Sequence, residues 1–283
     1  MKDEYPTAEV LVRNPEVAMQ AMEAYIKHKA GPFTNAPTTT GFASLQMIDP
    51  DLKDAQNHIQ SLVSSHTDPS GRDTLLARQL LDPKEAAAQL VCLPSGANME
   101  SVEEPEKLFF HDAPGNWMII GVCSTRSLSR GSVHIESSDP KKQPIIDPAY
   151  FSHPLDLDIA ARGILHTLNL AQHEPLKSKL RLDENGEFVT HPSAGPPPKT
   201  VEEAKKTASK STVTEYHPIG TCAMLPREKG GAVDNQLKVY GTSNVRVADA
   251  SIFPTNVQGN IVSLVYAVAE KASDIIKGKL PTA

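Results

Sequence analysis

A histidine and an asparagine near the C-terminus are the residues whose types and setting could do chemistry. His217 stands in the stretch "TEYHPIGTCAM", and Asn260 follows a glycine at the start of an apolar run. A neutral imidazole, with an unperturbed pKa of about 6.5, can accept a proton near neutral pH. An amide can donate a hydrogen bond to negative charge that develops on oxygen. The pair therefore predicts half of an active site.

Each of these residues also has a structural interpretation. A lone histidine more often makes structural hydrogen bonds than it catalyses, and asparagine is a preferred N-cap where a helix starts. Asp249 could serve only to cap a turn. The other nine histidines show no metal-ligand spacing, so we predict no metal site.

Hydrophobic patterning predicts the elements that must position these residues. Residues 14–30 are predicted to form a helix that stops at a Gly-Pro pair, and residues 51–81 and 83–90 to be helical as well. The runs "WMIIGVC" and "GSVHIES" predict two strands, paired as a hairpin or as antiparallel neighbours. A helix is expected after Pro154, and Thr200 with Glu203 predicts a capping box for a further helix.

The C-terminal segment carries the clearest pattern. The run "NVRVADAS" predicts a short strand, and residues 260–278 predict a helix. Apolar side chains crowd the first turns of that helix, too many for one narrow stripe. We therefore expect those turns to be buried on nearly all sides.

Composition and charge exclude several classes of protein. The chain has 283 residues, a net charge of -6 and three widely spaced cysteines. The acidic balance argues against a nucleic-acid partner, and the apolar runs are too short to span a membrane. The first residues, "MKDEYPTAEV", lack the features of a signal peptide, and an odd cysteine count argues against a disulfide framework. These features predict a cytoplasmic protein.

Three stretches near the C-terminus are "YHPIGTCAM", "GGAVDNQLKVYGTSNVRVADAS" and "QGNIVSLVYAVAEKASDII". Together they resemble the C-terminal signature of the glucose–methanol–choline (GMC) oxidoreductases, filamentous-fungal members in particular. The stretch "SLSRGSVHIESSDPKKQPIIDPAYFSHPLDLD" is similar to the segment that opens that family's C-terminal region. The resemblance implies an α+β substrate domain over residues 1–240, built on a mainly antiparallel sheet with helices on one face. Residues 241–283 would then be the strand and helix that join the family's FAD domain.

The resemblance also implies site residues. GMC enzymes oxidise alcohols with FAD, and His217 matches the family's catalytic base. Asn260 matches the second catalytic residue, which holds the alkoxide while the hydride passes to the flavin. The resemblance therefore implies that the side chains of His217 and Asn260 approach each other across one cavity. The cofactor-binding positions implied by the resemblance are Asp249, Ala250, Gly259, Asn260 and Ile261.

The family's dinucleotide-binding G-x-G-x-x-G loop is missing, because no G-x-G occurs anywhere in this sequence. The chain therefore resembles the second half of a family member. Without the amide donors and the helix dipole of that loop, we expect the chain alone not to hold FAD tightly. The C-terminal helix needs another cover, and we expect a homodimer or a partner chain to supply it.

Three functions are compatible with the sequence. The first is an FAD-dependent oxidoreductase of CH–OH groups in fungal secondary metabolism, acting on a small hydroxylated or carbonyl-bearing substrate. The second is a flavin-independent enzyme that reuses the cavity for isomerisation, dehydration or cyclisation. The third is a non-catalytic binding remnant. Because the chain begins with methionine and ends just past the family's last helix, we expect it to be complete, which favours the second.

Overall fold

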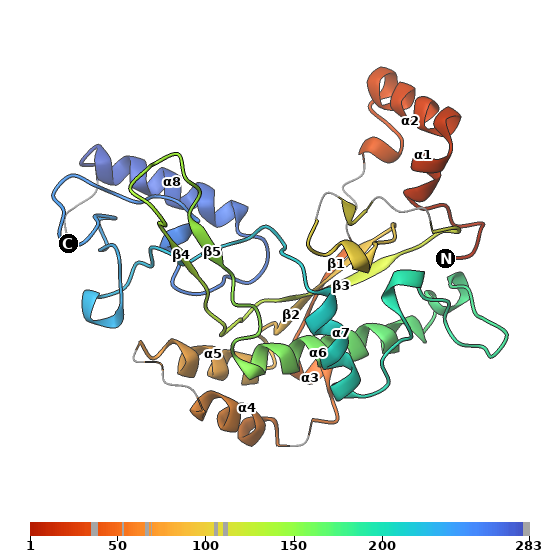
Figure 1. Ribbon diagram of the computed structural model, residues 1–283, viewed down its shortest axis with the longest axis horizontal. Coiled ribbons are helices and arrows are strands. Elements are labelled where there is room, and N and C mark those ends of the chain that lie inside the picture. The colour runs from red at the N-terminus through yellow and green to blue at the C-terminus, as the bar shows by residue number, and fades with distance from the viewer. Residues whose placement is uncertain are drawn as a thin grey trace. The chain divides into compact units, whose positions relative to one another are not determined.

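The computed structural model describes residues 1–34, 39–52, 54–65, 68, 70–104, 107–109 and 113–279 (Figure 1). The chain forms two compact units that interleave in sequence. The first unit comprises Met1–Asp51, Ala88–Cys123 and Leu157–Val213, and the second comprises Leu52–Ala87, Ser124–Asp156 and Thr214–Ala283. The division at residue 240 stays a prediction.

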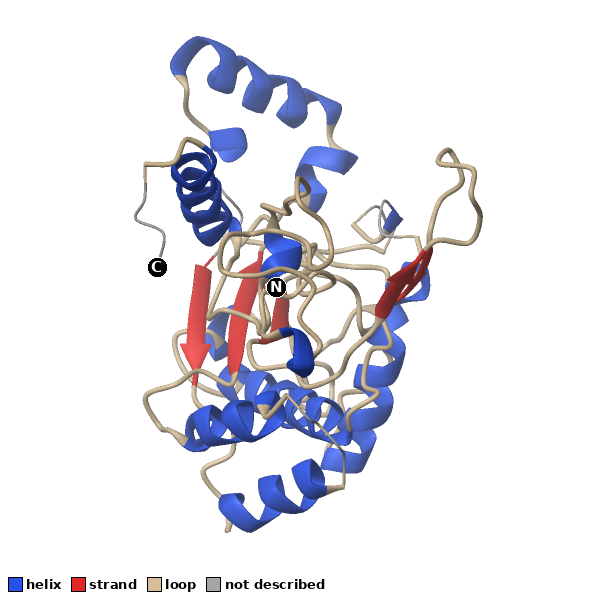
Figure 2. Cartoon of the chain, turned by 90° about the vertical axis from the view of Figure 1, so that its left-hand side faces the viewer, coloured by secondary structure: helices blue, strands red, loops and turns tan. Residues whose placement is uncertain are grey.

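The first unit is built around a three-stranded sheet in the order β1-β2-β3 (Figure 2). The strands are β1 (Thr39–Ala43), β2 (Ala88–Leu93) and β3 (Ile119–Ser124). β1 and β2 are antiparallel, with Thr39 opposite Cys92 and Ala43 opposite Ala88. The helices that belong wholly or mainly to this unit are α1 (Glu9–Arg13), α2 (Pro15–His28), α3 (Leu45–Ile48), α6 (Pro154–Ala171) and α7 (Val201–Ser211).

Helix α6 packs directly on the sheet. A Cβ atom added at Gly163 would lie 2.5 Å from Cγ1 of Val122 in β3, so a glycine lets the helix come this close. Arg162, one residue earlier, pairs with Asp158 at 2.7 Å and with Asp49. Lys205 of α7 lies 3.4 Å from the same Asp158. These contacts fix α6 to the sheet, to the end of α3 and to α7.

Local signals set the N-terminal ends of two helices. The side chain of Asn14 caps α2 by accepting from the backbone N–H groups of Glu16 and Val17. At α7 the Thr200 hydroxyl accepts from the Glu203 N–H at 3.2 Å, which confirms half of the capping box. The Glu203 carboxylate accepts in return from the N–H of Lys199, one residue before the N-cap.

The second unit contains helices α4 (Ala55–Ser64), α5 (Arg72–Leu81) and α8 (Val262–Ile276). Strands β4 (Ser132–His134) and β5 (Ile145–Asp147) form a two-stranded antiparallel sheet. The core of its C-terminal part consists of Val233, Leu237, Ile252, Phe253 and Ala272. One face of α8 packs on this core through Ile261, Leu264, Val265, Val268 and Ile275.

Short 3-10 helices connect these elements. They are η1 (Pro32–Thr34), η2 (Met99–Ser101), η4 (Lys177–Lys179), η5 (Pro192–Ala194), η6 (Arg227–Lys229) and η7 (Ala250–Ile252). In the described part of the chain, no helix is both long and apolar enough to cross a membrane.

The α+β class with antiparallel pairing is confirmed, as are strands in "WMIIGVC" and "GSVHIES". The predicted pairing of those two strands is wrong. β3 belongs to the three-stranded sheet, whereas β4 pairs with β5, placing Val133 opposite Ile146. Strand partners depend on distant segments, and a run of β-branched residues does not encode them.

Three other expectations are corrected. The helix predicted over 83–90 is wrong, because β2 starts at Ala88. Residues 86–89 are buried, so pairing and burial override the helix preference of the alanines. The helical stretch 51–81 is two helices, α4 and α5. The run "NVRVADAS" is no strand: Arg246 makes an isolated bridge with Lys238, and the 3-10 helix η7 follows.

Candidate functional site

All predicted site residues lie in the second unit, within its segment Thr214–Ala283. The chain around His217 is held by a local turn, in which the Tyr216 N–H donates to the Thr214 hydroxyl at 3.0 Å. Tyr216 itself adopts a positive φ of 64°. This turn makes an abrupt change of direction directly before the histidine.

The imidazole of His217 is accessible, with 28% of the side chain exposed. Its Nδ1 lies 3.9 Å from Oε2 of Glu215, and the two form an ion pair when the ring is protonated. At 3.9 Å the two atoms are beyond hydrogen-bond distance.

A short run of backbone hydrogen bonds joins the histidine segment to the turn that carries two other predicted residues. The N–H groups of Gly220, Cys222 and Met224 donate to the carbonyls of Ala250, Ser251 and Ile252, at 3.4, 2.9 and 2.8 Å. Gly220 adopts a φ of +85°, and an added Cβ would lie 3.2 Å from the Phe253 carbonyl oxygen. The fold therefore brings the His217 segment beside Asp249 and Ala250.

Asp249 is the N-cap of η7, and its carboxylate accepts from the Ser251 N–H at 2.8 Å. The structural interpretation of this residue is thus confirmed. A role of Asp249 and Ala250 beside a flavin stays a prediction.

The segment before α8 holds the remaining predicted residues. Gly259 adopts a left-handed φ of 85°, and Asn260 is exposed. Ile261, with a helical φ of -77°, occupies the N-cap position, and α8 starts at Val262. The prediction that Asn260 is the N-cap of this helix is therefore wrong. That Asn260 and His217 face one cavity stays a prediction.

Sequence reasoning missed one residue that contacts this segment. Arg126 is buried, and its Nη1 donates to the backbone carbonyl of Asn256 at 3.1 Å. A charged residue directly after an apolar strand was the one available signal. The partner lies 130 positions away in the sequence, so spacing does not reveal the contact.

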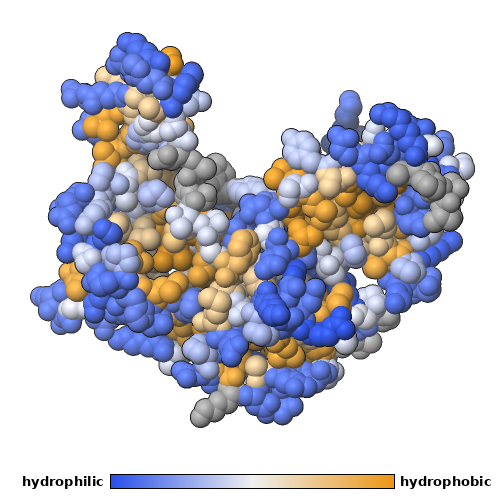
Figure 3. All heavy atoms as spheres, turned by 180° about the vertical axis from the view of Figure 1, so that it is seen from behind, coloured by the Kyte–Doolittle hydropathy of each residue, from blue (hydrophilic) through white to orange (hydrophobic). Residues whose placement is uncertain are grey.

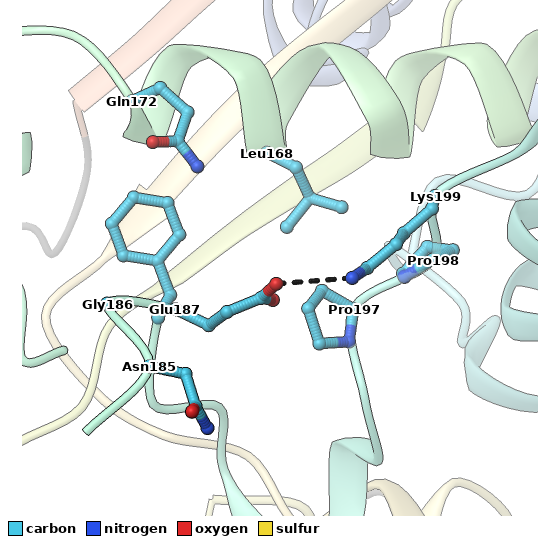
Figure 4. A pocket seen from close by; sticks show the side chains of 9 residues that line it. Leu168, Gln172, Asn185, Gly186, Glu187, Pro197, Pro198 and Lys199 are labelled. Atoms are coloured by element: carbon cyan, nitrogen blue, oxygen red, sulfur yellow. Dashed lines mark hydrogen bonds and ion pairs between the residues drawn. The ribbon is translucent and has the colours of Figure 1, made fainter. Parts of the chain in front are cut away.

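A hollow of about 340 Å³ lies in the first unit, and none of the predicted site residues lines it (Figure 4). Leu168 of α6 and Gln172, directly after the helix, form one wall, and Glu187 and Lys199 make an ion pair of 3.1 Å across it. The other lining residues are Asn185, Gly186, Phe188, Pro197 and Pro198. Both charged groups are largely exposed, so this arrangement offers no activated acid or base.

In the described ranges, no group of three or more His, Cys, Asp or Glu side chains could hold a metal ion. That the chain alone does not hold FAD tightly stays a prediction. The sequence lacks the glycine loop for the pyrophosphate, and the Asp249 carboxylate is already used as a cap.

Comparisons with other proteins identify the relatives of this chain. A family model described as GMC oxidoreductase matches residues 127–269. A dehydrogenase of Armillaria gallica is 30% identical over 310 residues, which covers 99% of this chain and 42% of that protein. The GMC oxidoreductase family protein Mala s 12 of Malassezia sympodialis is 45% identical over 151 residues, or 53% of this chain and 23% of its own.

Solved structures show the same fold. A formate oxidase is 25% identical, with a TM-score of 0.73, and the match covers 98% of this chain and 44% of that one. An FAD-dependent oxidoreductase from Chaetomium thermophilum, at 21% identity and a TM-score of 0.74, is similar in fold over 97% of this chain and 45% of its own. This chain spans less than half the length of each of these relatives. Matched by the family model over half of its residues, and by the Armillaria relative over nearly all of them, the chain belongs to the GMC oxidoreductase family.

Proposed function

We propose that this chain supplies the substrate-binding and catalytic face of an FAD-dependent oxidoreductase that acts on CH–OH groups. The observation that carries the proposal is the set of hydrogen bonds that joins the His217 segment to the Asp249–Ile252 turn, in a chain of this family. The substrate we propose is a small hydroxylated or carbonyl-bearing compound of fungal secondary metabolism, in keeping with the fungal relatives.

His217 is proposed as the general base. Its accessible ring would take the hydroxyl proton. The Asn260 amide would donate to the oxygen as negative charge develops there. A flavin held by the remainder of such an enzyme would accept the hydride.

The apolar face of α8 supports the presence of a flavin-binding half. Val262 is 60% exposed and Tyr266 72% exposed, so the expected burial of the first turns is not met within this chain. Apolar side chains also come to the surface on the face shown in Figure 3. Because the relatives have more than half of their length outside the match, we propose that polypeptide of that kind, in cis or in trans, covers this face.

The absorbance spectrum of the purified protein is the test. The chain alone is expected to lose flavin on gel filtration. Co-expressed with the flavin-binding half of a family member, it should show flavin bands that bleach without oxygen when an alcohol substrate is added. Bleaching should be lost in His217→Ala and kept in His134→Ala, which removes an exposed histidine of β4.

The same experiment decides about cofactor-free chemistry, which the missing G-x-G loop favours. Conversion of a substrate by the flavin-free chain, without net oxidation and dependent on His217, would support isomerisation, dehydration or cyclisation and count against the oxidoreductase. Flavin that stays bound stoichiometrically to the chain alone would contradict the expectation that another half must hold it.

A further inference from the structure

Arg126 is a buried charge in the second unit, directly after β3. Its side chain is 7% exposed, which removes the guanidinium from water at a considerable cost. Nη2 donates to Oε2 of Glu85 at 2.6 Å, and this carboxylate offsets the cost. An apolar residue would fill the same space without the cost of removing a charge from water, so a buried arginine at this position indicates a specific role.

The surroundings of Arg126 hold it in one place. The Thr125 hydroxyl donates to the Ala86 carbonyl at 2.5 Å, and the Thr125 N–H donates to the Ala87 carbonyl at 3.2 Å. These bonds tie the chain before Arg126 to the residues that follow Glu85. With Glu85 on Nη2, the planar guanidinium has a fixed orientation and presents Nη1 in a fixed direction.

The group that Nη1 meets is the Asn256 carbonyl oxygen, at 3.1 Å. Asn256 lies in the irregular stretch between η7 and α8 that also carries Gly259 and Asn260. At its other end this stretch runs into Ile261, which packs on the apolar core of the unit. The stretch that carries Asn260 is thus held at both ends, at Asn256 by the hydrogen bond from Arg126 and at Ile261 by apolar packing.

We propose that Arg126 is the positioning residue of this segment: by holding the Asn256 carbonyl, it sets where the Asn260 amide stands. Arg126 touches no reacting atom in this scheme and acts through Asn260. The proposal rests on the proposed role of Asn260 in catalysis, but the contact itself can be tested without any turnover.

The first measurement is the order parameter of backbone amides 257–260 by ¹⁵N relaxation, in the chain and in Arg126→Lys. Lysine keeps a positive charge for Glu85 but cannot hold both partners, since it lacks the planar fork. We expect the order parameters to fall from about 0.85 to below about 0.6 in this stretch, with those of α8 unchanged. Arg246→Lys is the matched control, because its guanidinium bonds the Gln236 carbonyl at a site away from this stretch.

The second measurement is turnover with the flavin-binding half present. We expect kcat to fall about 100-fold in Arg126→Lys with KM within about twofold, because a small misplacement of a catalytic group is costly while binding is kept. Millimolar guanidinium should restore part of kcat in Arg126→Ala. Where Arg126→Ala does not fold, Arg126→Lys carries the test.

Unchanged order parameters at 257–260 would overturn the proposal, whatever the activity. So would a mobile segment with wild-type kcat, since Arg126 would then be only structural. If the wild-type assembly oxidises no alcohol while the order parameters fall as expected, the contact stands and the proposed function fails.

Discussion

Helices α6 and α8 are both long and apolar, yet the chain covers them very differently. From residue 157 onward α6 has several buried side chains, among them Ile159, Ala161 and Thr167, and its charges are paired. In α8, all of whose residues the structure describes, Ala272 is the one buried residue. Val262, Tyr266 and Ile276 are each more than half exposed.

The difference shows which of the two helices this chain covers by itself. Fully burying an apolar side chain contributes about 1.5–3 kcal/mol, so three exposed ones leave a sizeable stabilisation unused. We therefore propose that other polypeptide covers this face of α8. The predicted catalytic residues lie in the same unit as α8, and this unit is where we expect the chemistry.

The largest effect expected concerns that chemistry. With the flavin-binding half present, His217→Ala should lower kcat/KM by about 10²–10⁴, the usual contribution of a general base. Steady-state kinetics on an alcohol measures it, with His134→Ala as the control for loss of a histidine. Equal rates in both variants would place the chemistry elsewhere than beside α8.

The well-covered helix should be sensitive to loss of charge. Burial alone would lower the pKa of Arg162, but the hydrogen bonds and charges of Asp158 and Asp49 raise it. Arg162→Ala removes the hydrogen bond to the buried Asp158, although Lys205 stays 3.4 Å from that carboxylate, and we expect the free energy of unfolding to fall by about 1.5–3 kcal/mol. Urea denaturation measures the loss. Lys271→Ala on the exposed side of α8 is the control, and equal losses in the two variants would remove the contrast between the helices.

Added volume should separate the helices as well. Gly163→Val pushes atoms into Val122, and we expect a loss of about 1–3 kcal/mol by overpacking. Ala267→Val adds two carbons, one fewer than Gly163→Val, at an exposed position of α8, where a change within about 0.5 kcal/mol is expected. Thermal unfolding of both variants compares them directly, and a tolerated Gly163→Val would show that α6 can move away from β3.

The smallest change in stability is expected from a substitution on the exposed face of α8. It is also the most informative about what covers that helix. Without a flavin-binding half, we expect a second copy of the chain to cover this face, so that light scattering gives the mass of a homodimer. Tyr266→Ser should then yield a monomer whose stability changes by no more than about 0.5 kcal/mol. A wild-type monomer would defeat the dimer, and an unchanged mass in Tyr266→Ser would move the interface away from α8.

The sequence by itself determined the features that depend on neighbouring residues, or only on whether a motif is present in the chain. Thr200 caps its helix as predicted, because a cap acts on N–H groups two or three residues away. The family motifs and the missing G-x-G loop likewise needed no coordinates. The apolar crowding of α8 was visible too, although the sequence does not say what covers it.

The tertiary structure decided what depends on segments far apart. It made residues 88–93 a strand, since pairing with β1 and burial outweigh the helix preference of alanines. It brought the His217 segment beside the turn of Asp249, and it set Arg126 on the Asn256 carbonyl. These contacts form because the chain buries apolar surface and then satisfies the polar groups enclosed with it, and no local rule of sequence specifies which distant partner does so.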